Sequence, residues 1–361
     1  MQIAKKRFGA LVLGICLLVA LAFGGHSVAQ AASWWPNPGN NELTIYPTGN
    51  DKLWEDLADA GAYVLLFKVA NAEPENDYEA FTYTYTDEFG GGLLPAPEVD
   101  APGATQRWQE MAKDAAKQVE EESPSEPAER GDFSKERGCT DEITLQTDGI
   151  YLAVVYSEYN ELWHWNEDHS TTITGARAEY TFMPQLIALP SKSADGSKSA
   201  SSDSGPWRKE LTITLKPEIK ERYGSLVINK TVDDPTSDES ATFVFHIVDT
   251  ETGGEKYENY AAITWPAANQ TTVTHIPAGM EVTVTEQYEG ARFDADGSAQ
   301  EVTIKADEGD VVKTEPVSFT NKGNDNETGG GNGIQNNFEL TKTGEGESAW
   351  DWTWTATPSQ Q

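Results

Sequence analysis

The clearest pattern in the chain is an alternation of apolar and polar residues between Gly224 and Asn321. Apolar side chains recur at every second position, as at Phe243, Phe245 and Ile247. A period of two is typical of β-strands that bury one face and expose the other. The segment is therefore predicted to consist of half-buried strands.

The region from residue 33 to residue 219 has a more varied pattern. A short helix is expected over Asp51–Ala60, because Leu53 and Leu57 recur at helical spacing and Gly61 follows as a stop signal. Asp148 and Gly149 indicate a hairpin turn. The expected strands are Leu43–Tyr46, Tyr63–Ala70, Phe81–Tyr85, Glu142–Leu145, Ile150–Tyr156 and Tyr180–Phe182. The second of them is apolar on both faces, which predicts a central strand.

An insertion is predicted between the strands, over about residues 95–137. Trp108, Met111, Ala115 and Val119 recur at helical spacing and predict an amphipathic helix. The segment 123–138 is rich in proline and charge and is expected to be a mobile loop. Ser191–Gly205, rich in serine, lysine and aspartate, is expected to be a solvated loop.

The tail from residue 323 to residue 361 predicts a Gly/Asn-rich linker and then a β-hairpin formed by Ile334–Leu340 and Trp350–Thr355. Trp350, Trp352 and Trp354 would share one face. This stripe could cover the edge of the preceding domain, or it could dock on another subunit or on glycan rings.

Residues 1–31 are typical of a secretory signal peptide, with a basic start, an apolar run over Ala10–Phe23 and small residues up to Ala31. The apolar run is too short for a comfortable membrane span. Cleavage would leave Cys139 as the single cysteine, so no internal disulfide could form. We expect Cys139 to be a small buried residue, and any covalent staple to be of another kind.

The chain is strongly acidic, with a formal net charge of -33, or -36 once the three basic residues of the leader are removed. Such a charge argues against nucleic acid and anionic lipid as partners. It favours a secreted protein at the cell surface, with no membrane segment after cleavage.

Three residues at the ends of the first, a middle and the last strand of the segment 224–321 suggest a specific chemistry. Lys230, buried among apolar side chains, could be neutral and nucleophilic. Glu286 in the same dry site could stay protonated, polarise the carboxamide of Asn321 and carry a proton while ammonia leaves. The product would be a Lys–Asn isopeptide bond. Alternatively, the three residues are ordinary solvated surface residues.

The stretches LVINK, VTVTE and VSFTN, which end at these residues, resemble the B-type repeat of collagen adhesins (Cna B-type) and the shaft domains of sortase-assembled pilins in Gram-positive bacteria. The resemblance implies an immunoglobulin-like Greek-key sandwich over 220–322. It also implies that Glu286 promotes the bond between Lys230 and Asn321. Asn336 and Asn337 are rival acceptors if the last strand lies further on. The fold class is thus all-β, with tandem sandwiches, a helical insertion in the first and a hairpin extension.

A second resemblance lies in the run from Trp207 to Lys216, which is similar to the WxxxVxVYPK pilin motif. Thr214 and Leu215 depart from it, because tyrosine and proline are usual at these positions. The resemblance marks Lys216 as the acceptor for a sortase acyl intermediate, and the segment Glu218–Arg222 is expected to be a linker. The alternative is a final strand with lysine at its exit.

The resemblance implies a structural subunit of a surface fibre, with other pilin subunits and a pilus sortase as partners. A secreted adhesin that binds a host protein or glycan is the alternative, using the loop Trp163–His169 or the tryptophan stripe. No hydrolase, phosphate-binding or metal motif is present, so we expect neither enzyme activity beyond self-cross-linking nor a cofactor. Two histidines in the Trp163 loop could bind a metal, but their spacing favours an exposed loop with a core-facing tryptophan.

Covalently joined pilins end in an LPxTG-like sorting motif, whereas this sequence stops at Gln361 without one. We therefore expect either a longer natural chain, or a subunit that ends the fibre or is held non-covalently.

Overall fold

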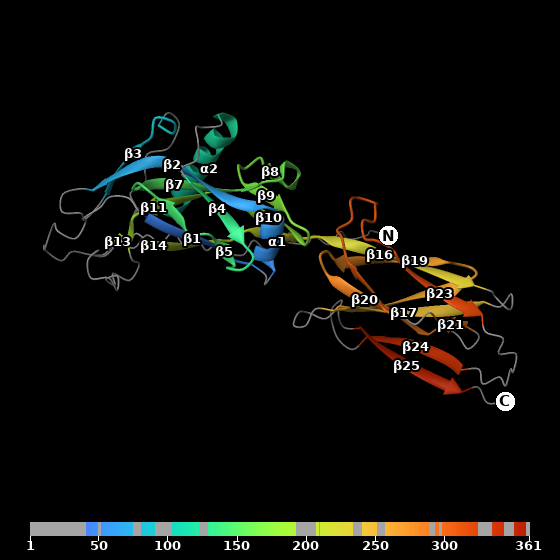
Figure 1. The fold of residues 1–361 in the computed structure, drawn as a ribbon. Coiled ribbons are helices and arrows are strands. Elements are labelled where there is room, and N and C mark those ends of the chain that lie inside the picture. The colour runs from blue at the N-terminus through green and yellow to red at the C-terminus, as the bar shows by residue number, and fades with distance from the viewer. Residues whose placement is uncertain are drawn as a thin grey trace, which may run out of the picture. The chain divides into compact units, whose positions relative to one another are not determined.

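The computed structural model describes residues 41–49, 52–74, 81–90, 103–122, 129–192, 207–208, 210–233, 240–250, 257–288, 293–295, 298–323, 334–342 and 350–358. These residues form two compact units (Figure 1). Unit 1 runs to Tyr223 and includes the short segments 277–279 and 305–307, and unit 2 contains the rest. Each unit is described by itself.

Unit 1 contains two α-helices, one 3-10 helix and fifteen strands among the described residues. In chain order these are β1 Asn41–Pro47, α1 Leu53–Asp59, β2 Ala62–Pro74, β3 Phe81–Tyr85, α2 Ala104–Glu122, β4 Glu129–Ser134, β5 Cys139–Thr140, β6 Ile143–Leu145, β7 Gly149–Ser157, η2 Asn160–Leu162, β8 Trp163–Trp165, β9 Thr171–Thr174, β10 Ala178–Phe182, β11 Gln185–Leu189, β12 Ser191–Lys192, β13 Trp207–Arg208, β14 Glu210–Leu215 and β15 Glu218–Glu221.

The strands of unit 1 form three main sheets. The largest has the order β11-β7-β2-β4-β5, with β3 also paired to β2. A second has the order β14-β1-β6, in which β1 and β14 are parallel, and a third has the order β15-β10-β9-β8. β12 and β13 pair with each other.

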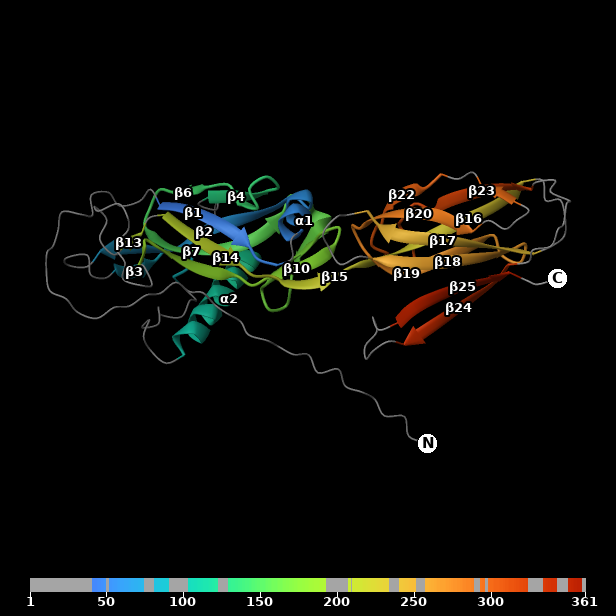
Figure 2. The same ribbon diagram turned by 90° about the horizontal axis from the view of Figure 1, so that it is seen from below.

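The largest sheet is buried on both faces. On one face Val64, Leu66 and Tyr151 join a core with residues of β1, β6 and α1. On the other face Leu152 and Val154 contact α2, which covers the side turned away from β1 and β6 (Figure 2). Burial on both faces explains why β7 and the first half of β2 are mostly apolar, and it confirms the central strand that the sequence predicts.

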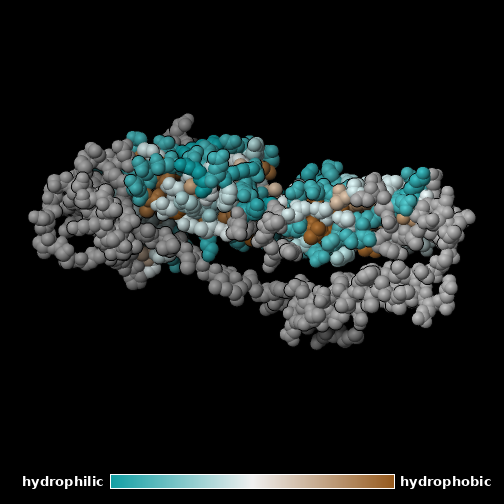
Figure 3. Space-filling view, turned by 60° about the horizontal axis from the view of Figure 1, so that its bottom comes forward, coloured by the Kyte–Doolittle hydropathy of each residue, from teal (hydrophilic) through white to brown (hydrophobic). Residues whose placement is uncertain are grey.

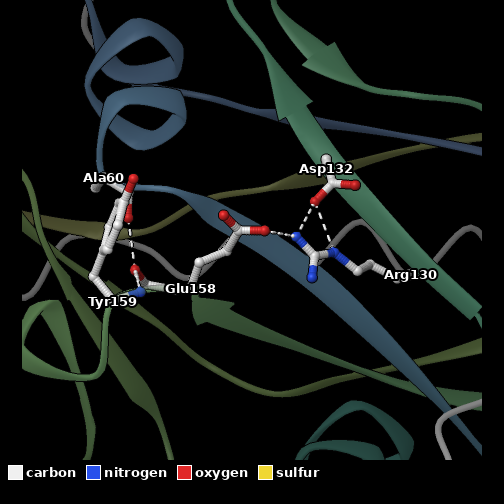
Figure 4. Close-up of polar contacts among 6 residues, drawn as sticks. Ala60, Arg130, Asp132, Glu158 and Tyr159 are labelled. Atoms are coloured by element: carbon white, nitrogen blue, oxygen red, sulfur yellow. Dashed lines mark hydrogen bonds and ion pairs between the residues drawn. The ribbon is translucent and has the colours of Figure 1, made fainter.

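The prediction of a loop over 123–138 is wrong for residues 129–134, which form β4 and join the largest sheet; residues 123–128 lie outside the described part. β4 is polar because its side chains are paired. Arg130 lies over the Tyr63 ring, 3.8 Å from its centroid, and binds Asp132 and Glu158 (Figure 4). Gly131 lies under Ile143, where a Cβ atom would come within 2.4 Å of Cδ1.

Three smaller expectations also need correction. β6 pairs with β1 whereas β7 pairs with β2 and β11, so Asp148 and Gly149 connect two sheets and form no hairpin. Trp163–Trp165 is the edge strand β8, because it pairs with β9. The expected linker Glu218–Arg222 contains β15, which pairs with β10. Cys139 is buried, as expected.

Unit 2 consists of ten described strands. In chain order they are β16 Tyr223–Asp233, β17 Ala241–Asp249, β18 Glu258–Trp265, β19 Gln270–Pro277, β20 Glu281–Tyr288, β21 Phe293–Ala295, β22 Gln300–Thr303, β23 Val317–Gly323, β24 Ile334–Lys342 and β25 Trp350–Pro358.

The first eight strands of unit 2 form a sandwich of two four-stranded sheets, β19-β16-β23-β21 and β18-β17-β20-β22 (Figure 1). The alternating residues Phe243, Phe245 and Ile247 are fully buried between the sheets, as the pattern predicts. The first strand, β16, lies parallel to the last, β23. The predicted all-β class with an immunoglobulin-like sandwich is thus confirmed.

β24 and β25 form the expected hairpin as a separate two-stranded sheet. Trp350, Trp352 and Trp354 occupy alternate register positions of β25. The predicted signal peptide 1–31 and most of the loop Ser191–Gly205 lie outside the described residues. Neither of the described helices has the length and apolar character to cross a bilayer. The face drawn in Figure 3 is mostly hydrophilic over its described residues, in keeping with the 59 acidic and 26 basic residues of the chain.

Candidate functional site

The lysine singled out in the sequence lies inside the sandwich of unit 2. Leu226, Ile228 and Lys230 alternate along β16 and face the core. The Lys230 side chain has 0% exposed surface. A lysine in such a position is unusual, because burial of a charged ammonium group costs roughly several kcal/mol unless a partner offsets the lost hydration.

Asn321 lies on the neighbouring strand β23, where Val317, Phe319 and Asn321 are all buried. In the parallel register Lys230 is opposite Phe319 and Val232 is opposite Asn321. Lys230 and Asn321 are therefore offset by two positions, roughly 7 Å along the strand direction. The long lysine side chain can bridge this offset. Asn321 has 0% exposed surface.

Glu286 reaches the same point from the facing sheet. It lies on β20, and its side chain is 4% exposed. Phe245 pairs with Glu286 and Val244 with Tyr288, so Gln287 is an extra residue in β20. This bulge lies directly beside Glu286, and bulges commonly redirect side chains and recur next to functional sites.

The carboxylate of Glu286 bridges the other two side chains. Lys230 Nζ lies 2.9 Å from Glu286 Oε2, and Asn321 Nδ2 donates a hydrogen bond of 3.0 Å to Glu286 Oε1. Asn321 Oδ1 is buried and accepts no hydrogen bond from any described residue. One acid thus contacts an amine and an amide at once, and the amide carbonyl is left without a donor.

Aromatic residues lie next to the polar groups, and in the strand register Phe319 is opposite Lys230 and Phe245 is opposite Glu286. The ring centroid of Phe243 lies 4.4 Å from Lys230 Nζ. Phe245 and Phe319 pack with their centroids 5.0 Å apart. Polar interactions are strong in such a dry site, and a separated pair of charges is costly there. Transfer of one proton from the ammonium to the carboxylate would leave a neutral amine and a neutral acid, which is the combination that acyl transfer needs.

Asn336 and Asn337 are the rival acceptors that the sequence predicts if the last strand lies further on. Both lie on β24, which pairs with β25 and with no other described strand. Asn321, in contrast, lies on β23, the strand that pairs with β16. The aromatic residues Phe243, Phe245 and Phe319 were not named as part of the site, although their alternation in sequence already assigns them to the inner face.

Lys216 is exposed in the two-residue segment between β14 and β15. The preceding residues Leu211, Ile213 and Leu215 pack against the core of unit 1. The alternative of a strand with lysine at its exit therefore describes the local structure, and the exposed amine is also compatible with an acceptor.

The aromatic residues of the Trp163 segment pack against each other. The rings of Trp163 and Trp165 both lie edge-to-face on Tyr156, with centroid distances of 4.8 and 5.8 Å. His169 Nδ1 lies 2.8 Å from Glu120 Oε2 of α2. Within the described part of the chain, no three histidine, cysteine or acidic residues gather in a way that could hold a metal ion.

Comparison with known proteins gives one family model. It is described as "Domain of unknown function (DUF5979)" and matches residues 226–339, which include Lys230, Glu286 and Asn321. No curated protein matches the chain.

Several solved structures are similar to most of the chain. The minor pilin GBS52 of Streptococcus agalactiae is 11% identical, with 78% of this chain and 96% of that chain covered and a TM-score of 0.23. The shaft pilin SpaA of Lactobacillus rhamnosus GG is 12% identical, with 80% and 98% covered and a TM-score of 0.24. The basal pilin SpaE of the same organism is 12% identical, with 77% and 90% covered and a TM-score of 0.29. At these identities and TM-scores, functional conclusions have to rest on the residues of this chain.

Proposed function

We propose that the chain is a structural, pilin-like subunit of a Gram-positive cell-surface fibre, and that an isopeptide bond between Lys230 and Asn321 locks unit 2. The observation that carries this proposal is the bridge by Glu286, whose two oxygens lie 2.9 Å from Lys230 Nζ and 3.0 Å from Asn321 Nδ2. The site thus contains the three groups that the reaction requires: a buried amine, a carboxylic acid and a carboxamide.

The reaction needs no external reagent. Proton transfer to Glu286 frees the lone pair of Lys230 Nζ, which attacks Cγ of Asn321. With the carboxamide turned so that Oδ1 faces Glu286, the protonated acid donates to this oxygen and stabilises the charge that develops on it. The Nζ–Cγ bond forms, the Cγ–Nδ2 bond breaks, and ammonia leaves with the proton that Glu286 relays from the amine.

The proposed bond would protect unit 2 against tension. β16 and β23 are parallel, so a pull on the start of β16 and the end of β23 loads the two strands in opposite directions. A covalent link from Lys230 to Asn321 would carry the force from one strand to the other. Residues 231–320 would then be bypassed by the load. A component of a surface fibre needs this property, whereas an enzyme or a soluble carrier does not.

Further features of the chain fit the same role. A secreted chain whose only cysteine after the expected leader is Cys139 has no internal disulfide to resist tension. Lys216 offers an exposed amine at the exit of β14, in the run that resembles the pilin motif. We infer that Lys216 accepts a neighbouring subunit from a pilus sortase. The other pilin subunits and this sortase would be the partners of the protein.

Single-molecule stretching of the full mature chain through its two ends tests the locking role. Lys230→Arg cannot form the bond, and it should add an unfolding event in which residues 231–320 become extended, roughly 30 nm of contour length. The matched control is Lys220→Arg, since Lys220 is a surface lysine with 77% of its side chain exposed. The control should behave like the wild type. An event of this length in the wild type would contradict the proposal.

A further inference from the structure

Unit 1 contains a second buried asparagine with an unsatisfied carbonyl. Among the described residues, four buried side-chain polar atoms lack a hydrogen-bond partner, and two of them are asparagine Oδ1 atoms. One belongs to Asn321 and the other to Asn41, and both residues have 0% exposed surface. Buried amide oxygens are normally paired, so an unpaired one calls for an explanation.

Asn41 also contacts a buried acid, as Asn321 does. Asn41 is the first residue of β1, and its Nδ2 donates a hydrogen bond of 2.9 Å to Asp148 Oδ1. Asp148 is 6% exposed and lies in the connection between β6 and β7. A second, longer contact of 3.4 Å joins Asn41 Nδ2 to the carbonyl oxygen of Thr147. The carboxamide is therefore held against the Thr147–Asp148 connection.

A lysine reaches the same connection from β2. Lys68 lies opposite Tyr151 in the register of β2 and β7, and its Nζ donates a hydrogen bond of 2.7 Å to Thr147 Oγ1. Thr147 Oγ1 lies 2.8 Å from the hydroxyl of Tyr151, which donates to the carbonyl oxygen of Thr147. Burial lowers the pKa of Lys68, against the opposing effect of the charge of Asp148.

The backbone around Lys68 leaves space for its side chain. The register of β2 and β7 shifts between Lys68 and Ala70, as β20 shifts beside Glu286. Gly149 lies next to the lysine, where a Cβ atom would come within 2.9 Å of Lys68 Cε and 2.3 Å of the Ala70 carbonyl oxygen. Only glycine leaves this space open, so the connection between β6 and β7 fits around the lysine side chain.

We propose that Lys68 and Asn41 are a second cross-linking pair, in which Asp148 acts as the proton-transferring acid and an isopeptide bond joins β1 to β2. This inference rests on the proposed function, because it extends the same chemistry to unit 1. The bond would tie the β14-β1-β6 sheet to the largest sheet of the unit, across the core that both enclose.

The step balances without a co-reactant. Lys68 Nζ leaves Thr147 and attacks Cγ of Asn41, so a C–N bond forms. The Cγ–Nδ2 bond breaks, and Nδ2 departs as ammonia with the proton that Asp148 takes from the amine and returns. No group is oxidised or reduced. The unpaired Oδ1 of Asn41 becomes the carbonyl oxygen of the new amide.

Intact-mass spectrometry of the mature full-length chain tests this proposal separately from the first bond. The wild type should be lighter than its sequence by two molecules of ammonia. Lys68→Arg and Lys230→Arg should each restore one of them, and the double variant should have the full sequence mass. Lys220→Arg is the control and should retain both losses. Peptide mapping of the wild type should find the segment with Asn41 joined to the segment with Lys68, a result that does not depend on the folding of any variant.

The outcomes separate the two proposals. A single loss that Lys230→Arg removes and Lys68→Arg leaves would overturn the second cross-link and support the first. A single loss that only Lys68→Arg removes would support the second and overturn the first. A wild type at full sequence mass would overturn both, and the polar contacts of Asn41 would then be a purely non-covalent cluster.

Discussion

Asn321→Ala is the perturbation that separates the proposed bond from the polar contacts around it. The variant removes the electrophile but keeps the contact of 2.9 Å between Lys230 and Glu286, so no buried charge loses its partner. A link between residues 230 and 321 closes a loop of about 90 residues, and loss of such a cross-link raises the chain entropy of the unfolded state by an equivalent of about 4.6 kcal/mol. Loss of an ordinary hydrogen bond to a charged acceptor would cost only about 1.5–3 kcal/mol.

Differential scanning calorimetry of the full chain, with the intact mass of each sample, distinguishes these magnitudes. For a domain of this size, about 4.6 kcal/mol corresponds to a fall in the melting temperature of unit 2 of roughly 20–35 °C. Asn229→Ala is the matched control, because Asn229 is the same residue type on the neighbouring strand β16, and its side chain makes a contact of 3.4 Å to Ser318. The control should change the stability by less than about 1 kcal/mol.

The reasoning would be refuted by a small effect. If Asn321→Ala costs no more than about 3 kcal/mol, and its mass differs from that of the wild type only by the substitution, then the wild type held no bond at this site.

Four further predictions follow from the described contacts. Glu286→Gln keeps an acceptor for Lys230 but cannot relay a proton, so the chain should keep the ammonia of the first site; an unchanged loss in its intact mass would show that Glu286 has no such role. Asp56 accepts hydrogen bonds from two backbone N–H groups at residues 176–177 and from the hydroxyl of Tyr180. Asp56→Asn has a single acceptor oxygen, so it should lower the free energy of unfolding of unit 1 by about 2–4 kcal/mol in chemical denaturation. An unchanged free energy of unfolding would contradict this. Burial, reinforced by a nearby carboxylate, raises the pKa of Tyr83 from 10.0 to about 12, so the unfolded chain loses this proton first as the pH rises. The melting temperature of unit 1 should therefore fall between pH 10 and 12, with no contribution from this group below pH 10, and the fall should be shallower in Tyr83→Phe. A pilus sortase with an LPxTG peptide as acyl donor should label the wild type and not Lys216→Arg, and labelling of the variant at the same rate would exclude Lys216 as the acceptor.

The arrangement of unit 2 could be predicted largely from local patterns. Alternation places Lys230 in line with Ile228, Glu286 in line with Val284, and Asn321 in line with Phe319. A period of two fixes which face of a strand each residue occupies. The parallel pairing of β16 with β23 and its offset of two residues could not be predicted in this way, because pairing between strands distant in sequence depends on the whole sandwich.

Unit 1 was harder to predict, since its signals conflict. The sequence Asp148–Gly149 is a strong hairpin signal, but here it crosses between two sheets, which hid its contact with Asn41. β4 reads as a charged loop because its ion pairs, such as Arg130 with Glu158, form only after folding. One signal was present in the sequence: Lys68 interrupts the otherwise apolar run Tyr63–Ala70, and a lysine in a central strand requires a polar partner.

The covalent lock of unit 2 is tested most directly by tandem mass spectrometry of a proteolytic digest of the mature wild-type chain. A branched peptide in which Lys230 Nζ is joined to Asn321 Cγ, lighter by one ammonia than its two parts, is the predicted result. Recovery of both segments as separate, unmodified peptides would contradict it.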